Sequence, residues 1–322
     1  MPEHVSVLLN EVLAQAKDAQ TNSCDKEFVV LDATLGLAGH SRAILEHCNV
    51  NFLYGYDQDS EARRIAEHNL IDFAGKFEIY PNNFCQISEL KLNPTFNGLN
   101  FILFDLGVSN LQLVEAERGF SFINDGPLDM RMNQSNNDAL TASDLVNNLS
   151  VAELTEIFRT FGEEKYAYKI AKAIDRKRQD GFAFKTTFEL VDVIRTTLPQ
   201  AVQRASGGHP ARRVFQALRI AVNSEMDVLE RALTSAFDLL KGHGVLCAIS
   251  YHSLEDKIVK KLMRKKEADC IGICKPRKAI TPTEEEIKSN YKSRSAKMRV
   301  FVRFDETEEK EARQNAKVLF PY

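Results

Sequence analysis

Hydrophobic positions in the first 104 residues form short apolar runs, separated by longer stretches with helical spacing. The runs are residues 28–31, 52–56, 77–80 and 101–104, which have the length of strands and are rich in Phe, Val, Ile and Tyr. Residues 5–16 instead place Val and Leu on one face of a helix. This alternation of buried strands and helices predicts an α/β fold with a mainly parallel sheet.

Polar residues become more frequent between residues 141 and 198, where the pattern is helical. Ser150 with Glu153 and Thr186 with Glu189 have the spacing of capping boxes, which begin helices. The expected helices are residues 151–161, 166–178 and 187–197. No strand–helix–strand unit is recognisable in this stretch, which therefore predicts a helical domain inserted into the sheet domain.

The sheet is expected to resume after the turn-forming residues 206–210. Apolar residues spaced three and four apart from Phe215 to Leu240 predict one long core-facing helix, which the glycines of residues 242–244 end. Residues 245–249 read as a buried strand, and the alternating residues 298–304 as a last, antiparallel strand at the sheet edge. The predicted domains are residues 1–112 and 209–322 for the sheet and residues 113–208 for the inserted loop and helical domain.

Composition narrows the class of protein. The chain has 322 residues, 44% of them hydrophobic, enough for two domains. No apolar run approaches the ~20 residues that cross a bilayer, and the N-terminus lacks the basic segment of a signal peptide. Six scattered cysteines fit a reducing compartment, and Cys270 with Cys274 lack the further ligands of a structural zinc site. We expect a cytoplasmic protein with no membrane partner and no metal.

Charge is distributed unevenly along the chain. The net charge is only −3, which does not indicate a protein that binds nucleic acid with its whole surface. Residues 257–299, however, contain fourteen Lys and Arg against five Asp and Glu. This basic segment either is a solvated surface or follows a phosphate backbone.

Residues 101–132 contain an unusual concentration of polar and bulky side chains around a strand end. The apolar run stops at Asp105, and a polar loop follows that returns repeatedly to Phe and Met. Ligands of open α/β sheets bind outside the carboxyl ends of the strands, and long loops in compact domains are usually functional. The loop therefore favours a site over the alternative of a buried strand with a surface loop.

The first predicted strand leads into the turn of residues 32–41, which contains Gly36 and Gly39. A glycine turn between strand and helix suits a nucleotide, although the third glycine of the dinucleotide fingerprint is missing. Asp57 ends the second strand eighteen residues after Gly39, where a carboxylate accepts the ribose hydroxyls of a bound adenosine. Its alternative role is to cap the helix that begins near Ser60. Phe84 could cover an adenine ring or belong to the core.

A second polar segment, residues 250–256, follows the strand at 245–249. His252 lies at that strand's carboxyl end, where a substrate or proton-transfer role competes with a structural one. Ser253 could cap the next helix, with Asp256 as its partner at the third helical position.

Together these motifs resemble the family of S-adenosylmethionine-dependent small-subunit ribosomal RNA (cytosine-N4)-methyltransferases known as RsmH or MraW. The resemblance covers nearly the whole chain, and DGPLDMRM and HSLED are its most specific motifs. The others are HVSVLLNE, DATLGLAGHS, GYDQD, ILFDLGVSNLQL, ERGFSF, FGEEKYA, FQALRIAVNSE and YHSLEDKIVK. It implies a class I methyltransferase sheet, Rossmann-like, with an inserted helical domain, and a cytosine of the ribosomal decoding region as substrate.

The resemblance also carries over the family's contacts with S-adenosyl-L-methionine. They fall on Ala38, Gly39, His40, Asp57, Phe84, Asp105 and Gln112. The chain departs from the family at Leu37 and Ala38, where glycine is common, and at Leu111 and Val114, where Pro and Asp are usual. Ala38 permits a backbone contact if its φ is negative, and the missing proline leaves the loop around Gln112 less rigid.

The chemistry that the resemblance implies needs help from the protein, because the lone pair of the cytosine N4 amine is delocalised into the ring. Acceptors for its two hydrogens would localise that pair toward the methyl group, and we assign Asp105 and the Leu106 carbonyl to this role. His252 is the candidate acceptor of the released proton. The target base must leave its stack and rest against an aromatic wall. The predicted substrate contacts are Ser109, Phe120, Phe122, Tyr251 and Ser253.

Three other functions stay open. A DNA amino-methyltransferase would share the cofactor, but the Asp/Asn-Pro-Pro-aromatic motif is absent. A nicotinamide dehydrogenase would need the third glycine. A non-catalytic RNA-binding assembly protein would bind RNA without transferring a methyl group. The expected partner is small-subunit ribosomal RNA, and the sequence leaves a homodimer open.

Overall fold

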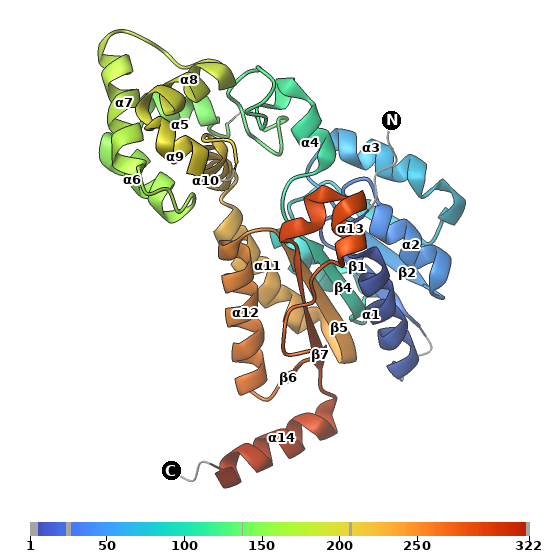
Figure 1. The fold of residues 1–322 in the computed structure, drawn as a ribbon. Coiled ribbons are helices and arrows are strands. Elements are labelled where there is room, and N and C mark those ends of the chain that lie inside the picture. Colours follow the sequence, from blue (N-terminus) through green and yellow to red (C-terminus); the bar gives the residue numbers. More distant parts are fainter. Residues whose placement is uncertain (1–5, 24–26, 137, 206–207, 320–322) are drawn as a thin grey trace. The chain divides into compact units, whose positions relative to one another are not determined.

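The computed structural model describes residues 6–319 apart from residues 24–26, 137 and 206–207. The chain divides into two compact units, each with its own hydrophobic core (Figure 1). Unit 1 comprises Met1–Gly107 and Met226–Tyr322, and unit 2 comprises Val108–Glu225.

Unit 1 is built on a sheet whose strands are short apolar segments. Within the described residues it has seven strands: β1 Val29–Asp32, β2 Phe52–Tyr56, β3 Phe77–Tyr80, β4 Leu99–Asp105, β5 Leu240–Ser250, β6 Gly272–Cys274 and β7 Lys297–Arg303. In β4 every residue except Asp105 is buried, as expected for a parallel strand covered on both faces. The strands predicted at residues 52–56 and 77–80 are confirmed without a shift.

The strand order is β3-β2-β1-β4-β5-β7-β6. Strands β1 to β5 are parallel, whereas β7 is antiparallel to both β5 and β6. The order reverses between β1 and β4, and open α/β sheets bind ligands outside the carboxyl ends of the strands at such a point. This arrangement is the class I methyltransferase sheet, and the predicted fold class is confirmed.

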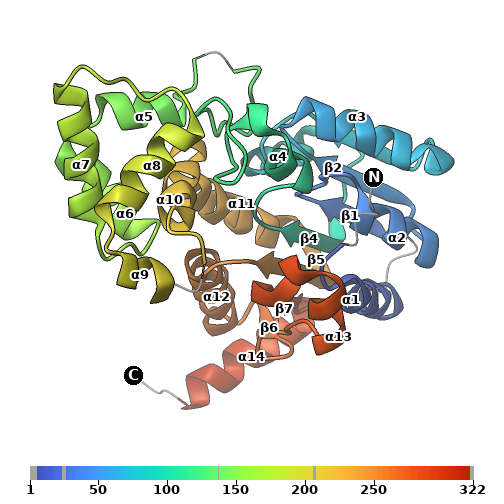
Figure 2. The same ribbon diagram turned by 45° about the horizontal axis from the view of Figure 1, so that its top comes forward.

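Helices cover both faces of the sheet (Figures 1 and 2). On one face α1, α2 and α3 share a core with the strands, and on the other α11, α12 and the 3-10 helix η2 do. Their bounds are α1 Leu9–Asn22, α2 Gly39–His47, α3 Ser60–Asn69, η2 Phe84–Leu92, α11 Glu225–Leu239 and α12 Ser253–Ala268. The remaining helices of unit 1 are η1 Ile71–Phe73, α13 Glu284–Ser289, η4 Tyr291–Ser295 and α14 Glu306–Leu319. Residue 5, the start of the predicted first helix, lies outside the described residues.

Unit 2 is helical, as predicted for the insertion, and two of its helices begin at the predicted capping boxes. In α6 Ser150 accepts from Glu153 N, and in α8 Thr186 accepts from Glu189 N. The helices of unit 2 are α4 Asn110–Val114, η3 Ala116–Arg118, α5 Ala142–Asn148, α6 Val151–Thr160, α7 Ala167–Gln179, α8 Thr187–Thr197, α9 Gln200–Ala205 and α10 Arg212–Asn223. In the described part of the chain, no helix is long and apolar enough to cross a membrane.

Three predictions about the second half of the chain are wrong. The long helix expected from Phe215 to Leu240 is two helices, α10 and α11, because Ser224 adopts a left-handed conformation with φ 48°. α10 packs within unit 2 against α5 and α6, so the sheet domain resumes later than residue 209. The last strand is antiparallel as predicted, but it is not at the edge because the short β6 pairs with its outer side.

Candidate active site

Three carboxylates mark the carboxyl edge of the unit 1 sheet. Asp32 and Asp105 are the last residues of β1 and β4, and Asp57 follows β2. β1 pairs in parallel with both β2 and β4, so the three strands end at the same edge. Negative charge therefore gathers where the fold places its ligands.

Asp57 is tied to the glycine turn. Its Oδ2 accepts from Gly36 N at 2.9 Å and its Oδ1 from Asp59 N at 2.8 Å. The alternative that Asp57 caps the next helix is wrong, because Asp59 caps α3. Burial raises the pKa of Asp57 to about 6, which outweighs the opposing effect of the two backbone N–H groups.

The glycine turn uses a left-handed alanine. Ala38, at the N-cap of α2, has φ 65°, so the condition of a negative φ is not met. The backbone adopts a left-handed conformation that favours glycine, at a cost of about 1–2 kcal/mol for a residue with a Cβ. A Cβ on the next residue, Gly39, would collide with Ser6 Oγ. A larger residue at position 39 would therefore require the Ser6 side chain to move.

Asp105 is held by groups from three segments. Tyr251 donates its hydroxyl to Oδ1 at 2.7 Å, and the Asp105 N–H donates to Thr34 Oγ1 at 2.6 Å. His40 Nδ1 lies 3.6 Å from Oδ2. The Asp105 side chain is 24% exposed, so it has a defined orientation and is still accessible to a ligand. Leu106 N donates to Ile249 O at 3.0 Å, which extends the pairing of β4 with β5 beyond Asp105.

His40 is buried between the N-terminal segment and Asp105. Its Nε2 lies 2.9 Å from the carbonyl oxygen of Val7, which can only accept, so Nε2 carries the proton. Burial lowers the pKa of His40 and raises that of the neighbouring Asp32, whose Oδ2 accepts from Ser41 Oγ at 2.7 Å. Both effects favour the neutral forms, so the environment limits how much charge this edge holds.

Glu255 positions the segment that follows β5. It is 2% exposed, and its Oε2 accepts from Tyr251 N at 2.8 Å and from His252 N at 3.2 Å. His252 is the N-cap of α12 and its Nδ1 accepts from Glu255 N at 3.5 Å. Its Nε2 lies 2.9 Å from Glu255 Oε1, outside the direction of a hydrogen bond. The predicted cap, Ser253, is instead the first helical residue.

Phe84 lies where the adenine-covering residue was predicted, just beyond β3. It is half-buried and meets Phe104 edge to face, with ring centroids 5.9 Å apart. Because Phe104 directly precedes Asp105, the Phe84 ring that contacts it lies near the carboxyl edge of the sheet. Its role as an adenine contact stays a prediction.

The other four predicted contacts belong to unit 2. Ser109 caps α4 and forms a capping box with Gln112, which is 5% exposed. Phe120 is 5% exposed within the core of unit 2, so its ring offers little surface to a base. Phe122 is half-buried and stacks on His209, with centroids 4.8 Å apart. Among these rings, Phe122 is the better candidate for a base contact.

Sequence reasoning did not single out Asp32, Thr34 or Glu255. Asp32 ends a predicted strand as Asp105 does, so the same rule could have found it. Thr34 and Glu255 act through tertiary hydrogen bonds, for which the sequence contains no local signal.

Comparison with known proteins shows the family of this chain. The model of the MraW methylase family matches residues 1–304. Ribosomal RNA small subunit methyltransferase H of Finegoldia magna is 40% identical over 313 residues, 92% of this chain and 97% of that protein. The protein of the same name from Halothermothrix orenii is 39% identical, covering 93% of this chain and 98% of its own. A solved rRNA methylase from Streptococcus thermophilus is 8% identical with a TM-score of 0.45, covering 94% of this chain and all of that one. The chain belongs to the MraW methylase family.

Proposed function

We propose that this protein transfers a methyl group from S-adenosyl-L-methionine to the N4 amine of a cytidine in the decoding region of small-subunit ribosomal RNA. The observation that carries the proposal is the fixed Asp105 carboxylate at the switch point of the sheet, beside the turn of residues 32–41. Family membership and the names of the relatives supply the substrate class.

The charge of the sheet edge supports this donor over a dinucleotide. S-adenosylmethionine has a positive sulfonium, which the Asp57 and Asp105 carboxylates at this edge attract. The pyrophosphate of a nicotinamide dinucleotide would meet the same two carboxylates with like charge. The donor therefore fits the residues present, and the dehydrogenase alternative is disfavoured.

Different residues would hold different parts of the donor. Asp57 would accept hydrogen bonds from the ribose hydroxyls. These bonds would offset the cost of burying the Asp57 carboxylate, which is half-buried and whose pKa is raised by burial to about 6. Phe84 would cover the adenine, and the backbone of residues 38–40 would contact the methionine part. The donor brings an activated methyl group, so the protein's task is to orient and to exclude water.

Asp105 is the acceptor that would orient the attacking amine. The Tyr251 hydroxyl restricts the carboxylate, and Thr34 accepts from the backbone N–H of the same residue. The Asp105 side chain is 24% exposed, which leaves it accessible to a ligand. A hydrogen bond from N4 to Asp105, together with one to the Leu106 carbonyl, would localise the nitrogen lone pair toward the methyl group. In the transfer, the new N–C bond would replace the donor's S–C bond, and the Asp105 carboxylate would stabilise the positive charge that N4 gains.

The released proton would leave from N4 after transfer. His252 stays the proposed acceptor, although both of its ring nitrogens lie against Glu255 and its capping role ties it to α12. Testing His252→Ala alongside His252→Asn separates the two roles, because asparagine can still cap a helix but cannot take up a proton. A low rate in both variants with unchanged stability would support the proton role.

Unit 2 would recognise the RNA around the target cytidine through Ser109 and Phe122. In unit 1, Tyr251 and Ser253 would also contact the RNA. The proposed substrate places the enzyme in the cytoplasm. A homodimer stays a proposal that sedimentation of the full chain would test.

The decisive experiment uses small ribosomal subunits that lack the modification. The protein is incubated with methyl-labelled donor, and the labelled nucleotide is located and its base analysed. We expect the label on N4 of a single cytidine in the decoding region. Label on another base would replace the proposed substrate, and subunit binding without label would favour the non-catalytic alternative.

A further inference from the structure

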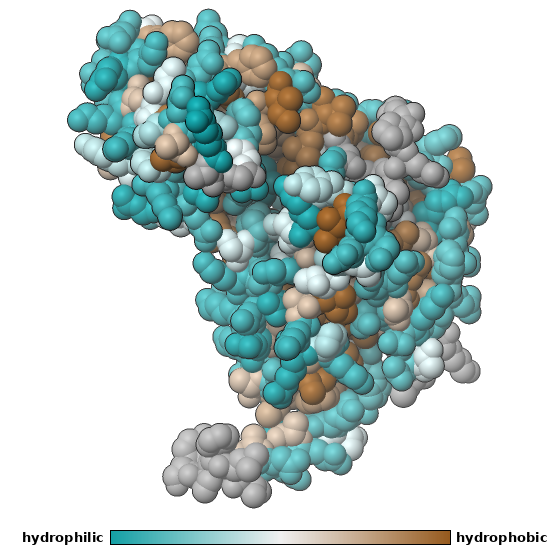
Figure 3. Space-filling view, viewed as in Figure 1, coloured by the Kyte–Doolittle hydropathy of each residue, from teal (hydrophilic) through white to brown (hydrophobic). Residues whose placement is uncertain are grey.

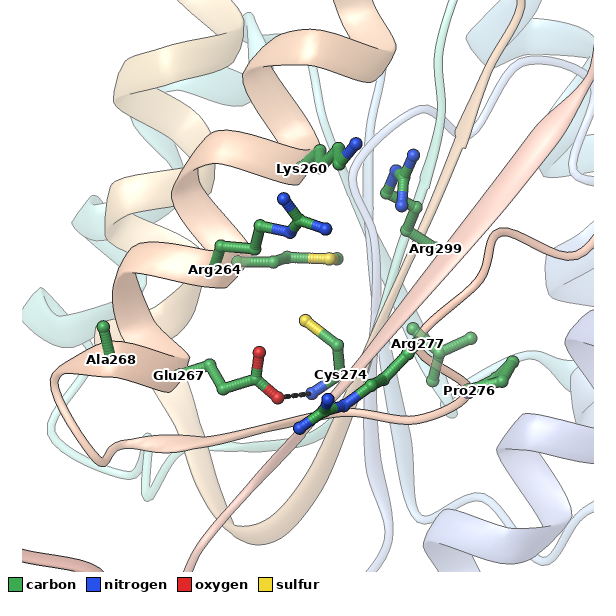
Figure 4. Close-up of a pocket in the computed structure, with 10 residues that line it drawn as sticks. Lys260, Arg264, Glu267, Ala268, Cys274, Pro276, Arg277 and Arg299 are labelled. Atoms are coloured by element: carbon green, nitrogen blue, oxygen red, sulfur yellow. Dashed lines mark hydrogen bonds between the residues drawn. The ribbon is translucent and has the colours of Figure 1, made fainter. Parts of the chain in front are cut away.

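A basic pocket of about 430 Å³ lies in unit 1 between α12 and the strands β6 and β7 (Figure 4). Its floor is apolar, because Met263 of α12 and Val300 of β7 are each 1% exposed. Four cationic side chains line it, against one acidic side chain, that of Glu267. The cations are Lys260 and Arg264 of α12, Arg277 after β6 and Arg299 of β7.

Three of the four cations form no ion pair with a carboxylate among the residues that the structure describes. Arg299 is the exception, since its Nε and Nη2 donate to the two oxygens of Asp256 at 2.6 and 3.1 Å. In the described part of the chain, no carboxylate oxygen lies within 4.0 Å of the side-chain nitrogens of Lys260, Arg264 or Arg277. The acid in the lining, Glu267, accepts from Cys274 N at 3.3 Å instead. The pocket therefore has uncompensated positive charge.

The arrangement of these cations costs stability unless an anion enters. Lys260 and Arg264 are four residues apart on α12, a spacing at which like charges destabilise a helix. Figure 4 shows both side chains extending from α12 toward Arg299 on the facing strand. Guanidinium groups that line one hollow can bind a phosphate, which accepts from paired N–H donors.

We propose that this pocket binds a backbone phosphate of the ribosomal RNA substrate, an inference that rests on the proposed function. α12 begins at Ser253, directly beyond the candidate active site, and Lys260 and Arg264 lie two to three turns further along it. At 1.5 Å per residue this is roughly 10–16 Å from the start of the helix. The bound phosphate therefore belongs to a nucleotide near the target cytidine and not to the target itself.

The pocket divides the basic segment of residues 257–299 into parts with different roles. Lys266 lies outside the lining, with its Nζ 3.7 Å from Asp238 and 5.4 Å from the centre of the Phe237 ring, so its contacts are structural. Lys265 and Lys278 are exposed and also lie outside the lining. Figure 3 shows hydrophilic surface over the segment labelled α12 in Figure 1, so hydrophilic character alone does not distinguish the pocket.

Two double variants test the proposal with matched charge. Arg264→Gln with Arg277→Gln removes two pocket cations, whereas Lys265→Gln with Lys278→Gln removes two cations at the adjacent positions outside it. Binding of the full chain to unmodified small subunits is measured between 50 and 200 mM salt. We expect the pocket variant to lose roughly tenfold in affinity and about one to two units of salt slope, and the control to lose much less. Thermal unfolding and donor titration check that both variants are folded and bind S-adenosylmethionine.

Equal losses of RNA affinity in the two variants would show that only the overall positive charge matters, which would overturn the pocket proposal. No loss of affinity in either variant would overturn it as well. Inorganic phosphate provides a further arm. If phosphate stabilises the unmodified chain but not the pocket variant, and the RNA salt slope is the same for both, the pocket binds free phosphate and the RNA assignment is overturned. A methylation assay separates the two proposals. If RNA binding depends on the pocket but N4 is not methylated, only the proposed function is refuted. If N4 is methylated but RNA binding does not depend on the pocket, only the pocket proposal is refuted.

Discussion

Asp57 and Asp105 lie at the same sheet edge, yet their surroundings prepare them for different tasks. Asp57 accepts two backbone N–H groups, and burial still raises its pKa to about 6. Asp105 is fixed by the Tyr251 hydroxyl and by Thr34 and is partly exposed. The first suits hydroxyls that donate to it, and the second suits a reacting amine.

Donor affinity should depend on pH through Asp57. A carboxylate accepts ribose hydroxyls better than a carboxylic acid does, and a pKa of about 6 puts the change near neutral pH. We expect constant affinity above pH 7 and a loss of about tenfold per pH unit below pH 6, measured by isothermal titration. Asp57→Asn should lower the affinity by about 1.5–3 kcal/mol and abolish this dependence. A flat profile for the unchanged protein would contradict the assignment.

The same residue gives a stability prediction of opposite sign. The folded-state pKa of Asp57, about 6, lies above its usual value of 3.8, so the folded protein binds more protons than the unfolded chain between these values. Without donor, this residue's contribution to the free energy of unfolding should decrease as the pH rises from about 4 to 6. Urea unfolding of the protein and of Asp57→Asn is compared across this pH range. If the difference between their free energies of unfolding does not change with pH, the predicted contribution of Asp57 is excluded.

The hydrogen bond from Tyr251 to Asp105 predicts an effect on the methylation rate without an effect on donor affinity. Tyr251→Phe keeps the ring and removes a hydrogen bond to a carboxylate, so we expect single-turnover methylation to slow by about ten- to a hundredfold. Asp105→Asn should slow it at least as much, because the charge that stabilises the developing positive N4 is lost. Donor affinity measured in parallel is the control for Tyr251→Phe. A normal rate for Asp105→Asn would leave the Leu106 carbonyl as the orienting group.

At the scale of elements, the junction of α10 and α11 depends on one strained residue. Ser224 is exposed and left-handed, with φ 48°, at the position where helices favour glycine. Ser224→Gly should raise the free energy of unfolding by about 0.5–1 kcal/mol, and Ser224→Val should lower it, because a β-branched residue tolerates this conformation poorly. Chemical denaturation measures both. Destabilisation by glycine would mean that the serine side chain makes a contact worth more than the strain.

At the scale of the whole molecule, the two hydrophobic cores predict separable stabilities. Leu154 is fully buried in unit 2, whereas all proposed donor contacts except Gln112 lie in unit 1. Leu154→Ala should destabilise unit 2 by about 2–5 kcal/mol. Hydrogen exchange should then accelerate in residues 108–225 and not in the sheet of unit 1, with donor affinity nearly unchanged. A matching loss of donor affinity would indicate that Gln112 contributes substantially to the donor site.

The sequence by itself determined the features that depend on neighbouring residues. Strands at residues 52–56 and 77–80 and the capping boxes of α6 and α8 follow from local spacing, and the structure confirms them. The strand-end positions of Asp57 and Asp105 follow in the same way. The specific motifs identified the family, which the comparisons show.

Tertiary structure decided what depends on residues far apart in the chain or on small energy differences. β6 has three residues, too few for a periodic pattern, and is a strand only because β7 pairs with it. The left-handed conformation of Ser224 costs only about 1–2 kcal/mol, so it does not require glycine. The hydrophobic pattern therefore continues through this position without a sign of the helix break. Tyr251 and Asp105 meet across 146 positions of sequence. Local patterns fix which elements form, because their energetics lie within a few residues, whereas the packing of the sheet brings the site residues together.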